Sequence, residues 1–171
     1  SRWLRAAGPS RGWRMSVGLQ RQAYEHTLLS GDAGLLFNAG VLTVSVRFEN
    51  KMITELADHR TGQHYGYELQ NIMPGTGRTI NQHFGFYRSH QVFGSGKAPQ
   101  LHTHLRMGAC SGSVFGSPCF SLGGDTTIRG VRRDTLEGDV FVLANLQLLI
   151  PLADTQYIRG VIFLDTGAAA D

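Results

Sequence analysis

Apolar and polar residues alternate along most of the chain, which is the period of a β-strand with one apolar face. The alternation is clearest in six stretches, at residues 13–19, 40–49, 65–70, 101–109, 140–150 and 158–164. In the fifth of these stretches, Val140 and Val142 fall on one face, whereas Asn145 and Gln147 fall on the other. No stretch follows the 3.6-residue period of an amphipathic helix. The pattern therefore predicts an all-β fold.

Segments rich in glycine, proline and small polar residues separate these stretches and predict tight turns. They lie at residues 30–32, 60–62, 73–77, 94–99 and 151–154. Short connections of this kind join antiparallel neighbours, so we predict an antiparallel sheet of about eight strands. One connection is much longer, from about residue 111 to 138, and a loop of that length is usually functional.

The same alternation fits two architectures, a soluble sandwich or a membrane barrel whose apolar faces meet lipid and whose polar faces line a lumen. The longest apolar stretches reach only about half of the ~20 residues that a membrane-spanning helix needs. Transmembrane strands need only ~9 to 11 residues and tolerate an overall polar composition, here a mean hydropathy of −0.14. The non-apolar face is rich in polar residues, and this favours the membrane barrel, in which that face lines the lumen. Four aromatic residues are then expected to be lipid-facing or interfacial: Tyr65, Tyr67, Phe84 and Phe86.

Positive charge is concentrated at the start of a chain whose net charge is +3. Five arginines precede the first acidic residue: Arg2, Arg5, Arg11, Arg14 and Arg21. A groove for single-stranded nucleic acid combines basic groups with stacking aromatics, and this segment offers only Trp3 and Trp13. We therefore expect a flexible basic start over residues 1–10 and no nucleic-acid partner.

The long connection and a later strand contain a set of regularly spaced residues. The connection has a phenylalanine, two adjacent glycines and an Ile-Arg-Gly tip, at Phe120, Gly123, Gly124, Ile128, Arg129 and Gly130. A Phe-x-Asp-x-Gly sequence follows, at Phe163, Asp165 and Gly167. The set resembles the C-terminal barrel of the BamA/TamA superfamily, the bacterial surface antigen family, whose members insert or translocate other proteins at outer membranes.

The resemblance implies that residues 11–171 are part of a transmembrane antiparallel β-barrel, with the long connection folded into the lumen. It further implies that Arg129, at the tip of the loop, is held by Asp165 on the second strand after it. Elementary chemistry agrees, because the guanidinium is a fixed fork of donors suited to a carboxylate. Asp165 is also out of phase with the apolar Ile162 and Leu164, which places it on the lumen side.

Two positions depart from the family pattern. Val131 stands where the family has an aromatic residue at the tip, and Gln147 stands where an acidic residue is often found on the first strand after the loop. Gln147 can accept a hydrogen bond but adds no charge, so we expect the charge of Arg129 to be balanced mainly by Asp165. The chain also ends before the last strands of such barrels, so we expect it to form only part of one.

The cysteines and histidines do not indicate a metal site. Cys110 and Cys119 are nine residues apart, with no metal-ligand spacing; they could form a disulfide, but two free thiols are the favoured state. Four histidines are expected to line the lumen, with His83 placed on the strand next to the first two: His102, His104, His83 and His64. No carboxylate with ligand spacing accompanies them, so we predict no metal.

Catalysis is also not expected. Asp58, His59 and Ser89 are the residue types of a hydrolase triad, but the chain has no Gly-x-Ser-x-Gly elbow to activate the serine. The resemblance instead implies a protein without enzymatic activity or cofactor, in the outer membrane of a bacterial cell, mitochondrion or plastid. Its partners would be outer-membrane lipid, unfolded barrel or secreted clients, and accessory assembly subunits. The alternatives are a passive pore, a polypeptide-secreting barrel, or a soluble β-rich binding module.

Overall fold

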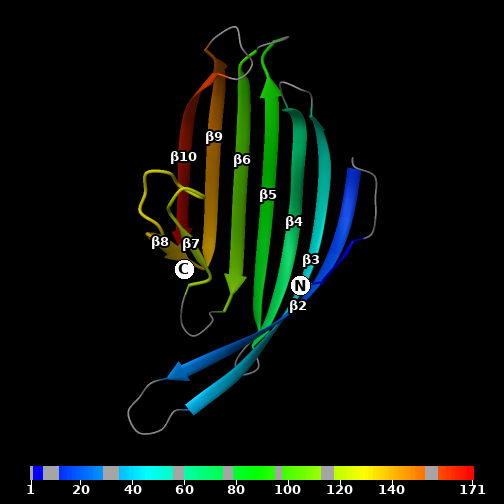
Figure 1. Ribbon diagram of the computed structural model, residues 1–171, viewed down its shortest axis with the longest axis vertical. Coiled ribbons are helices and arrows are strands. Elements are labelled where there is room, and N and C mark those ends of the chain that lie inside the picture. Colours follow the sequence, from blue (N-terminus) through cyan, green and yellow to red (C-terminus); the bar gives the residue numbers. More distant parts are fainter. Residues whose placement is uncertain are drawn as a thin grey trace.

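In the computed structural model the chain forms one large antiparallel β-sheet (Figure 1). The structure describes residues 2–5, 12–28, 35–55, 60–74, 79–94, 98–112, 118–152 and 158–171. Their strands are β1 (Arg2–Arg5), β2 (Gly12–Leu28), β3 (Leu35–Glu55), β4 (Arg60–Pro74), β5 (Ile80–Val92), β6 (Gln100–Ser111), β7 (Phe120–Leu122), β8 (Leu136–Gly138), β9 (Val140–Pro151) and β10 (Arg159–Ala170). The predicted all-β antiparallel fold is confirmed. No helix in this part of the chain is long and apolar enough to cross a membrane.

The main sheet has eight strands in the order β1-β2-β3-β4-β5-β6-β9-β10. Every strand pairs with its sequence neighbour except at one place, where β6 pairs with β9. The long connection between these two strands contains the separate β7–β8 hairpin, which lies in front of β9 and β10 in Figure 1. Within the described residues β1 and β10 each have one neighbour, so they are the edges of an open sheet.

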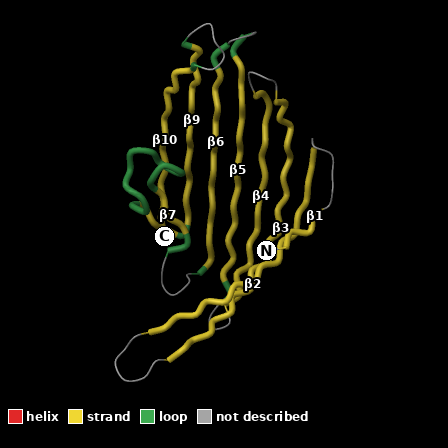
Figure 2. The backbone as a smooth tube through the Cα atoms, in the orientation of Figure 1, coloured by secondary structure: helices red, strands yellow, loops and turns green. Residues whose placement is uncertain are grey.

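The β2–β3 hairpin is longer than the rest of the sheet. The pairing of β3 with β4 ends where Val41 lies opposite Pro74, whereas the pairing of β2 with β3 continues to Leu28 and Leu35. Figure 2 shows this hairpin projecting below the other strands. Residues 2–5, which the sequence places in a flexible start, pair with β2 as strand β1.

The two faces of the sheet have different compositions, as the alternation predicts. One face has a row of apolar side chains at one level of the sheet, from β2 to β9, which only Gly85 of β5 interrupts: Met15, Phe48, Tyr67, Met107 and Val142. All five are exposed, with Met107 and Val142 both at 57%. We call this the outer face.

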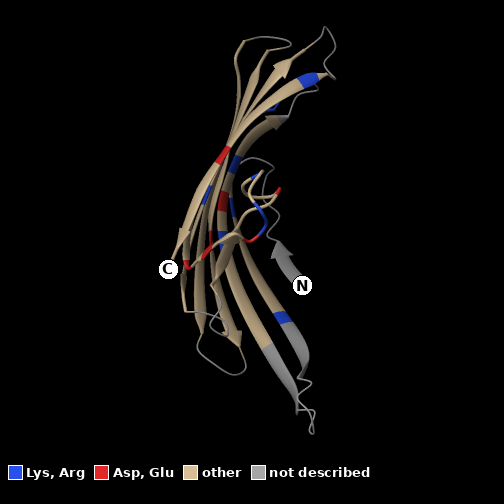
Figure 3. Cartoon of the chain, turned by 90° about the vertical axis from the view of Figure 1, so that its left-hand side faces the viewer, with Lys and Arg blue, Asp and Glu red and all other residues tan. Residues whose placement is uncertain are grey.

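The opposite face has a polar row, again formed by direct cross-strand partners, from β4 to β10: His64, Arg88, His104, Asn145 and Asp165. The β7–β8 hairpin and its turn rest on this side, and Figure 3 shows the sheet edge-on as a curved layer with the hairpin to one side of it. We call this the loop face.

A small apolar core lies between the loop and the sheet. It consists of three loop residues and two residues of β9: Phe120, Leu122, Ile128, Phe141 and Leu143. The ring of Phe120 contacts the ring of Phe141 edge-on, with centroids 4.8 Å apart. This core holds the loop against β9, because its apolar side chains leave water only when the loop is docked.

The prediction that Phe84 and Phe86 belong to the lipid-facing aromatic set is wrong. Both share the loop face with Arg88, and the ring of Phe84 contacts Phe120 at 5.3 Å between centroids. Tyr65 and Tyr67 do lie on the outer face. The cause is local, because each face of this part of β5 mixes aromatic and polar residues, Phe86 with Arg88 on one face and Tyr87 with Ser89 on the other, so the pattern does not define which face is apolar.

The predicted turns and the residues of the supposed triad can be compared with the structure in part. The turn predicted at 60–62 belongs to β4, whose first residue is Arg60. The segments 29–34, 56–59 and 75–78 lie outside the described residues, and with them Asp58 and His59. Ser89 is buried within β5, at 3% exposure.

Candidate functional site

The turn that follows β7 depends on two adjacent glycines. Gly123 and Gly124 have φ angles of 124° and 85°, a region that side chains with a Cβ rarely occupy. A Cβ on Gly123 would lie 2.1 Å from the carbonyl oxygen of Arg132. The amide of Gly123 donates to Thr127 Oγ1 at 2.7 Å, and that hydroxyl donates to the Gly123 carbonyl at 2.8 Å. The glycine pair thus closes the turn that presents the tip.

Arg129 at the tip is bound by Asp165 of β10. Its Nε donates to Asp165 Oδ2 at 2.6 Å and its Nη2 donates to Oδ1 at 2.7 Å. The backbone amide of Arg129 adds a third bond to Oδ2, at 3.0 Å. This is the bidentate geometry in which Arg–carboxylate pairs are strongest. The structure therefore contains the pair that the sequence predicts.

The pair is enclosed by two further side chains of the sheet. Asn145, directly opposite Asp165, donates through Nδ2 to Asp165 Oδ1 at 2.8 Å and to the Thr127 carbonyl at 2.7 Å. The Arg129 guanidinium lies over the Phe163 ring, with Cζ 3.8 Å from the centroid, which is a cation–π contact. The Asp165 side chain is 2% exposed and that of Arg129 is 25% exposed. We call Arg129, Asp165, Asn145 and Phe163 the loop lock.

The electrostatics of the tip follow from this geometry. The hydrogen bonds from the guanidinium to Asp165 raise the pKa of Arg129 above its ordinary value, an effect that desolvation partly opposes. Arg129 therefore remains a cation, and the pair binds the loop without a titratable step near neutral pH. The arrangement positions a loop and offers no nucleophile or general base.

The other residues of the predicted motif surround the lock. Ile128 is buried at 6% exposure, and a Cβ on Gly167 would lie 3.1 Å from its Cδ1. Gly130 has a φ of 84°, which turns the chain after the tip. Val131, in place of the family aromatic, packs against the small core and donates its amide to the Ile128 carbonyl at 3.3 Å.

Gln147 is not part of the lock. It lies opposite Phe163 and lines a cavity on the loop face, and no hydrogen bond joins it to Arg129 or Asp165 in the described part of the chain. Asn145, two residues earlier on the same face, makes the contact instead. Sequence reasoning missed Asn145 because only the register of β9 against β10 places it directly opposite Asp165.

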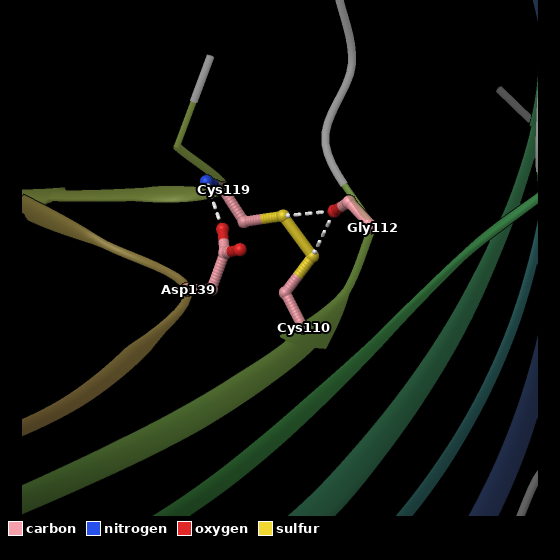
Figure 4. Close-up of a disulfide and its surroundings, with 4 residues drawn as sticks. All are labelled: Cys110, Gly112, Cys119 and Asp139. Atoms are coloured by element: carbon pink, nitrogen blue, oxygen red, sulfur yellow. Dashed lines mark hydrogen bonds between the residues drawn. A yellow bond between two sulfur atoms is a disulfide. The ribbon is translucent and has the colours of Figure 1, made fainter. Parts of the chain in front are cut away.

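A disulfide joins the start of the loop to the sheet, so the favoured prediction of two free thiols is wrong. Cys110 at the end of β6 bonds to Cys119, with Cα atoms 6.3 Å apart (Figure 4). Asp139 accepts the Cys119 amide through Oδ1 at 3.1 Å, and its carbonyl accepts the Cys110 amide at 2.8 Å. The bond thus fixes the base of the loop between β6 and β9. Ligand atoms of Cys110, Cys119 and Asp139 lie within 4.8 Å of one another, but both sulfurs belong to the disulfide.

The histidines divide between the two faces. His102 lies opposite His90, with ring centroids 4.4 Å apart, and not beside His83 as predicted. His83 is on the outer face, where it forms a hydrogen bond with Tyr67. His83 and His90 are seven residues apart on β5, and an odd separation along a strand places them on opposite faces. His64 contacts Glu49 Oε2 at 3.2 Å on the loop face.

Comparison with known proteins leaves the family open. No protein-family model matches this sequence, and no curated protein matches it. The functional inference therefore depends on the loop lock and on the two faces of the sheet.

Proposed function

We propose that this chain is part of a transmembrane β-barrel of the outer membrane that assists the insertion or translocation of other outer-membrane proteins. The observation that supports this most is the loop lock, in which Arg129 at an Ile-Arg-Gly tip is bound by Asp165 of a Phe-x-Asp-x-Gly strand. The spacing of those residues resembles the BamA/TamA superfamily, and the contact joins its two separate motifs.

The two faces of the sheet support the membrane part of the proposal. An exposed apolar row crosses the outer face from Met15 to Val142, whereas soluble proteins rarely expose large contiguous apolar patches. The loop face is polar and has a cavity of about 520 Å³. Strands β2 to β6, β9 and β10 have 12 to 21 residues, more than the ~9 to 11 that cross a bilayer.

In the proposed mechanism the chain guides client strands and does no covalent chemistry. A sheet edge presents unpaired backbone donors and acceptors, which a second strand can pair with. Asp165 lies on β10, so the lock fixes the loop to the sheet on its loop face. We propose that this keeps the lumen in the geometry that receives an unfolded client, whose strands would pair with an edge of the barrel, with lipid and accessory subunits as further partners.

The test is the folding of an added client. Vesicles with and without the full-length protein receive a urea-unfolded outer-membrane barrel, and its folded fraction is followed by heat-modifiable gel migration. We expect faster folding with the wild-type protein and a loss of that acceleration with Arg129→Ala. Arg133→Ala is the matched control, because Arg133 is in the same loop, is 87% exposed and, in the described structure, forms its ion pair with the neighbouring, exposed Asp134.

The outcomes separate the parts of the proposal. Wild-type protein that inserts into vesicles without accelerating the client would refute the assembly function and leave a pore or secretion barrel. Protein that stays in the aqueous phase would refute the membrane location. An equal loss of activity in Arg133→Ala would remove the lock as the cause.

A further inference from the structure

The arginines of the loop face are not all balanced by carboxylates. Arg14 Nη1 lies 3.6 Å from Glu49 Oε1, and Arg47 Nε donates to Glu68 Oε2 at 2.7 Å. Arg129 has Asp165, as described above. Arg88 and Arg106 differ, because neither forms an ion pair with a carboxylate among the described residues. Positive charge therefore accumulates on the facing parts of β5 and β6.

These two arginines are neighbours. Arg88 lies directly opposite His104, and Arg106 is two residues further along β6 on the same face. Arg88 and Arg106 are thus diagonal cross-strand neighbours, a relation with a typical Cα separation of about 7–8 Å. Two like charges at such a distance destabilise the fold unless water or an anion lies between them.

Their donors are only partly used. Arg88 Nε donates to His104 Nε2 at 3.1 Å, which makes that ring nitrogen an acceptor, and the terminal amino groups of Arg88 form no hydrogen bond with any residue that the structure describes. Arg106 Nη2 donates to the Thr126 carbonyl at 2.8 Å, which fixes the guanidinium beneath the loop. Arg106 Nε is buried and has no hydrogen-bond partner in the described structure. A buried donor without a partner keeps the cost of leaving water uncompensated, so an acceptor at this point would stabilise the fold.

Open space adjoins both side chains. The cavity of about 520 Å³ is lined by Arg88, His104 and Arg106 together with Phe86. A second cavity, of about 270 Å³, lies between the loop and the sheet and shares Arg88 and His104 with the first. A small anion could therefore reach the cluster from the loop face.

We infer that Arg88 and Arg106, with His104 between them, form a binding site for a phosphate-type oxyanion beneath the tip of the loop. Their donors belong to two guanidinium groups on two strands, and two such groups suit a tetrahedral anion better than the single planar fork that matches a carboxylate. The phosphate could be free or part of a lipid headgroup. The inference goes beyond the proposed function and does not require client assembly.

The test is calorimetric titration of the full chain, folded in detergent, with inorganic phosphate at constant ionic strength. We expect Arg88→Gln and Arg106→Gln each to weaken phosphate binding by about tenfold or more, the loss of a charged hydrogen bond. The matched control is Arg133→Gln, which removes the same charge from an exposed position and should change the affinity by less than about twofold.

Two further arms identify the ligand. Acetate should bind much more weakly than phosphate, and equal affinity would overturn the phosphate assignment. Short-chain phosphatidylglycerol that displaces phosphate with higher affinity would identify a lipid headgroup as the source, and weaker displacement would identify free phosphate.

A measurement on the wild-type chain alone tests the inference even if the variants do not fold. Phosphate should raise the temperature of thermal unfolding more than chloride does at equal ionic strength, because a ligand bound only by the folded state stabilises it. No binding heat together with equal effects of phosphate and chloride would overturn the inference, whatever the result of the client assay.

Discussion

Replacing either member of the Arg129–Asp165 pair should loosen the loop by a predictable amount. Arg129→Ala removes two hydrogen bonds from a carboxylate that is 2% exposed, and a charged hydrogen bond contributes about 1.5–3 kcal/mol. The carboxylate keeps the backbone amide of residue 129 and Asn145 Nδ2 as donors, which reduces the penalty. The full cost of breaking a buried pair, about 3–5 kcal/mol, is therefore an upper limit. We expect a loss of about 2–4 kcal/mol.

Asp165→Ala should cost a similar amount. It leaves the Arg129 guanidinium without its carboxylate, but that side chain is 25% exposed and can partly turn to water. The double variant should be little worse than either single variant, because both remove the same interaction. The coupling energy of the cycle should then be about 2–3 kcal/mol, at the upper end for residues in contact.

The assay is urea-induced unfolding of the full-length protein, with wild type, both single variants and the double variant measured together. A second cycle on Arg133 and Asp134 is the matched control, because that pair is 3.5 Å apart but its side chains are 87% and 53% exposed. Its coupling should stay below about 1 kcal/mol. Additive losses in the Arg129–Asp165 cycle, with a coupling no larger than that of the control, would refute the loop lock.

Three other sets of substitutions test the outer face, the glycine turn and the disulfide. Val142→Arg on the outer face should destabilise the vesicle-inserted protein by ~2–4 kcal/mol if residue 142 lies near the midplane of the bilayer. The loss would be seen as a loss of heat-modifiable gel migration. Migration like that of the wild-type protein would argue against a lipid contact. In chemical denaturation, Gly123→Ala should destabilise the fold by more than Gly130→Ala does. Both glycines have positive φ, but only at Gly123 would the new Cβ meet a backbone atom, at 2.1 Å. Equal losses of stability would contradict this difference in packing. Replacing Cys110 and Cys119 by Ser should lower the free energy of unfolding by about 2–3 kcal/mol, as expected for so short a loop. Two thiols that react with a reagent in the native wild-type protein would contradict the disulfide.

The periodic parts of the fold were predictable from the sequence, because a strand with one apolar face has a period of two. That period placed Asp165 opposite in phase to Ile162 and Leu164, on the face that the loop tip reaches. The glycine pair was also predictable, since the turn requires positive φ at Gly123 and Gly124.

The other features depend on register, which a sequence pattern does not fix. Asn145 contributes to the lock only because it is the direct partner of Asp165. The disulfide forms because β6 pairs with β9 and β7 pairs with β8, which brings Cys110 and Cys119 together on either side of Asp139. The sequence pattern misplaced Phe84 because both faces of β5 mix aromatic and polar residues, so neither face is clearly apolar.

The proposed function requires one face of this sheet to meet lipid and the other to line an aqueous lumen beneath the locked loop. Two positions on β9 test it directly, Val142 on the outer face and Gln147 on the loop face. Single nitroxide labels at these sites, in vesicle-reconstituted protein, report collisions with oxygen, which concentrates in the bilayer, and with a water-soluble nickel complex. We expect oxygen, and not the nickel complex, to reach the label at residue 142, and the nickel complex, and not oxygen, to reach the label at residue 147. Equal access of the nickel complex to both labels would contradict it.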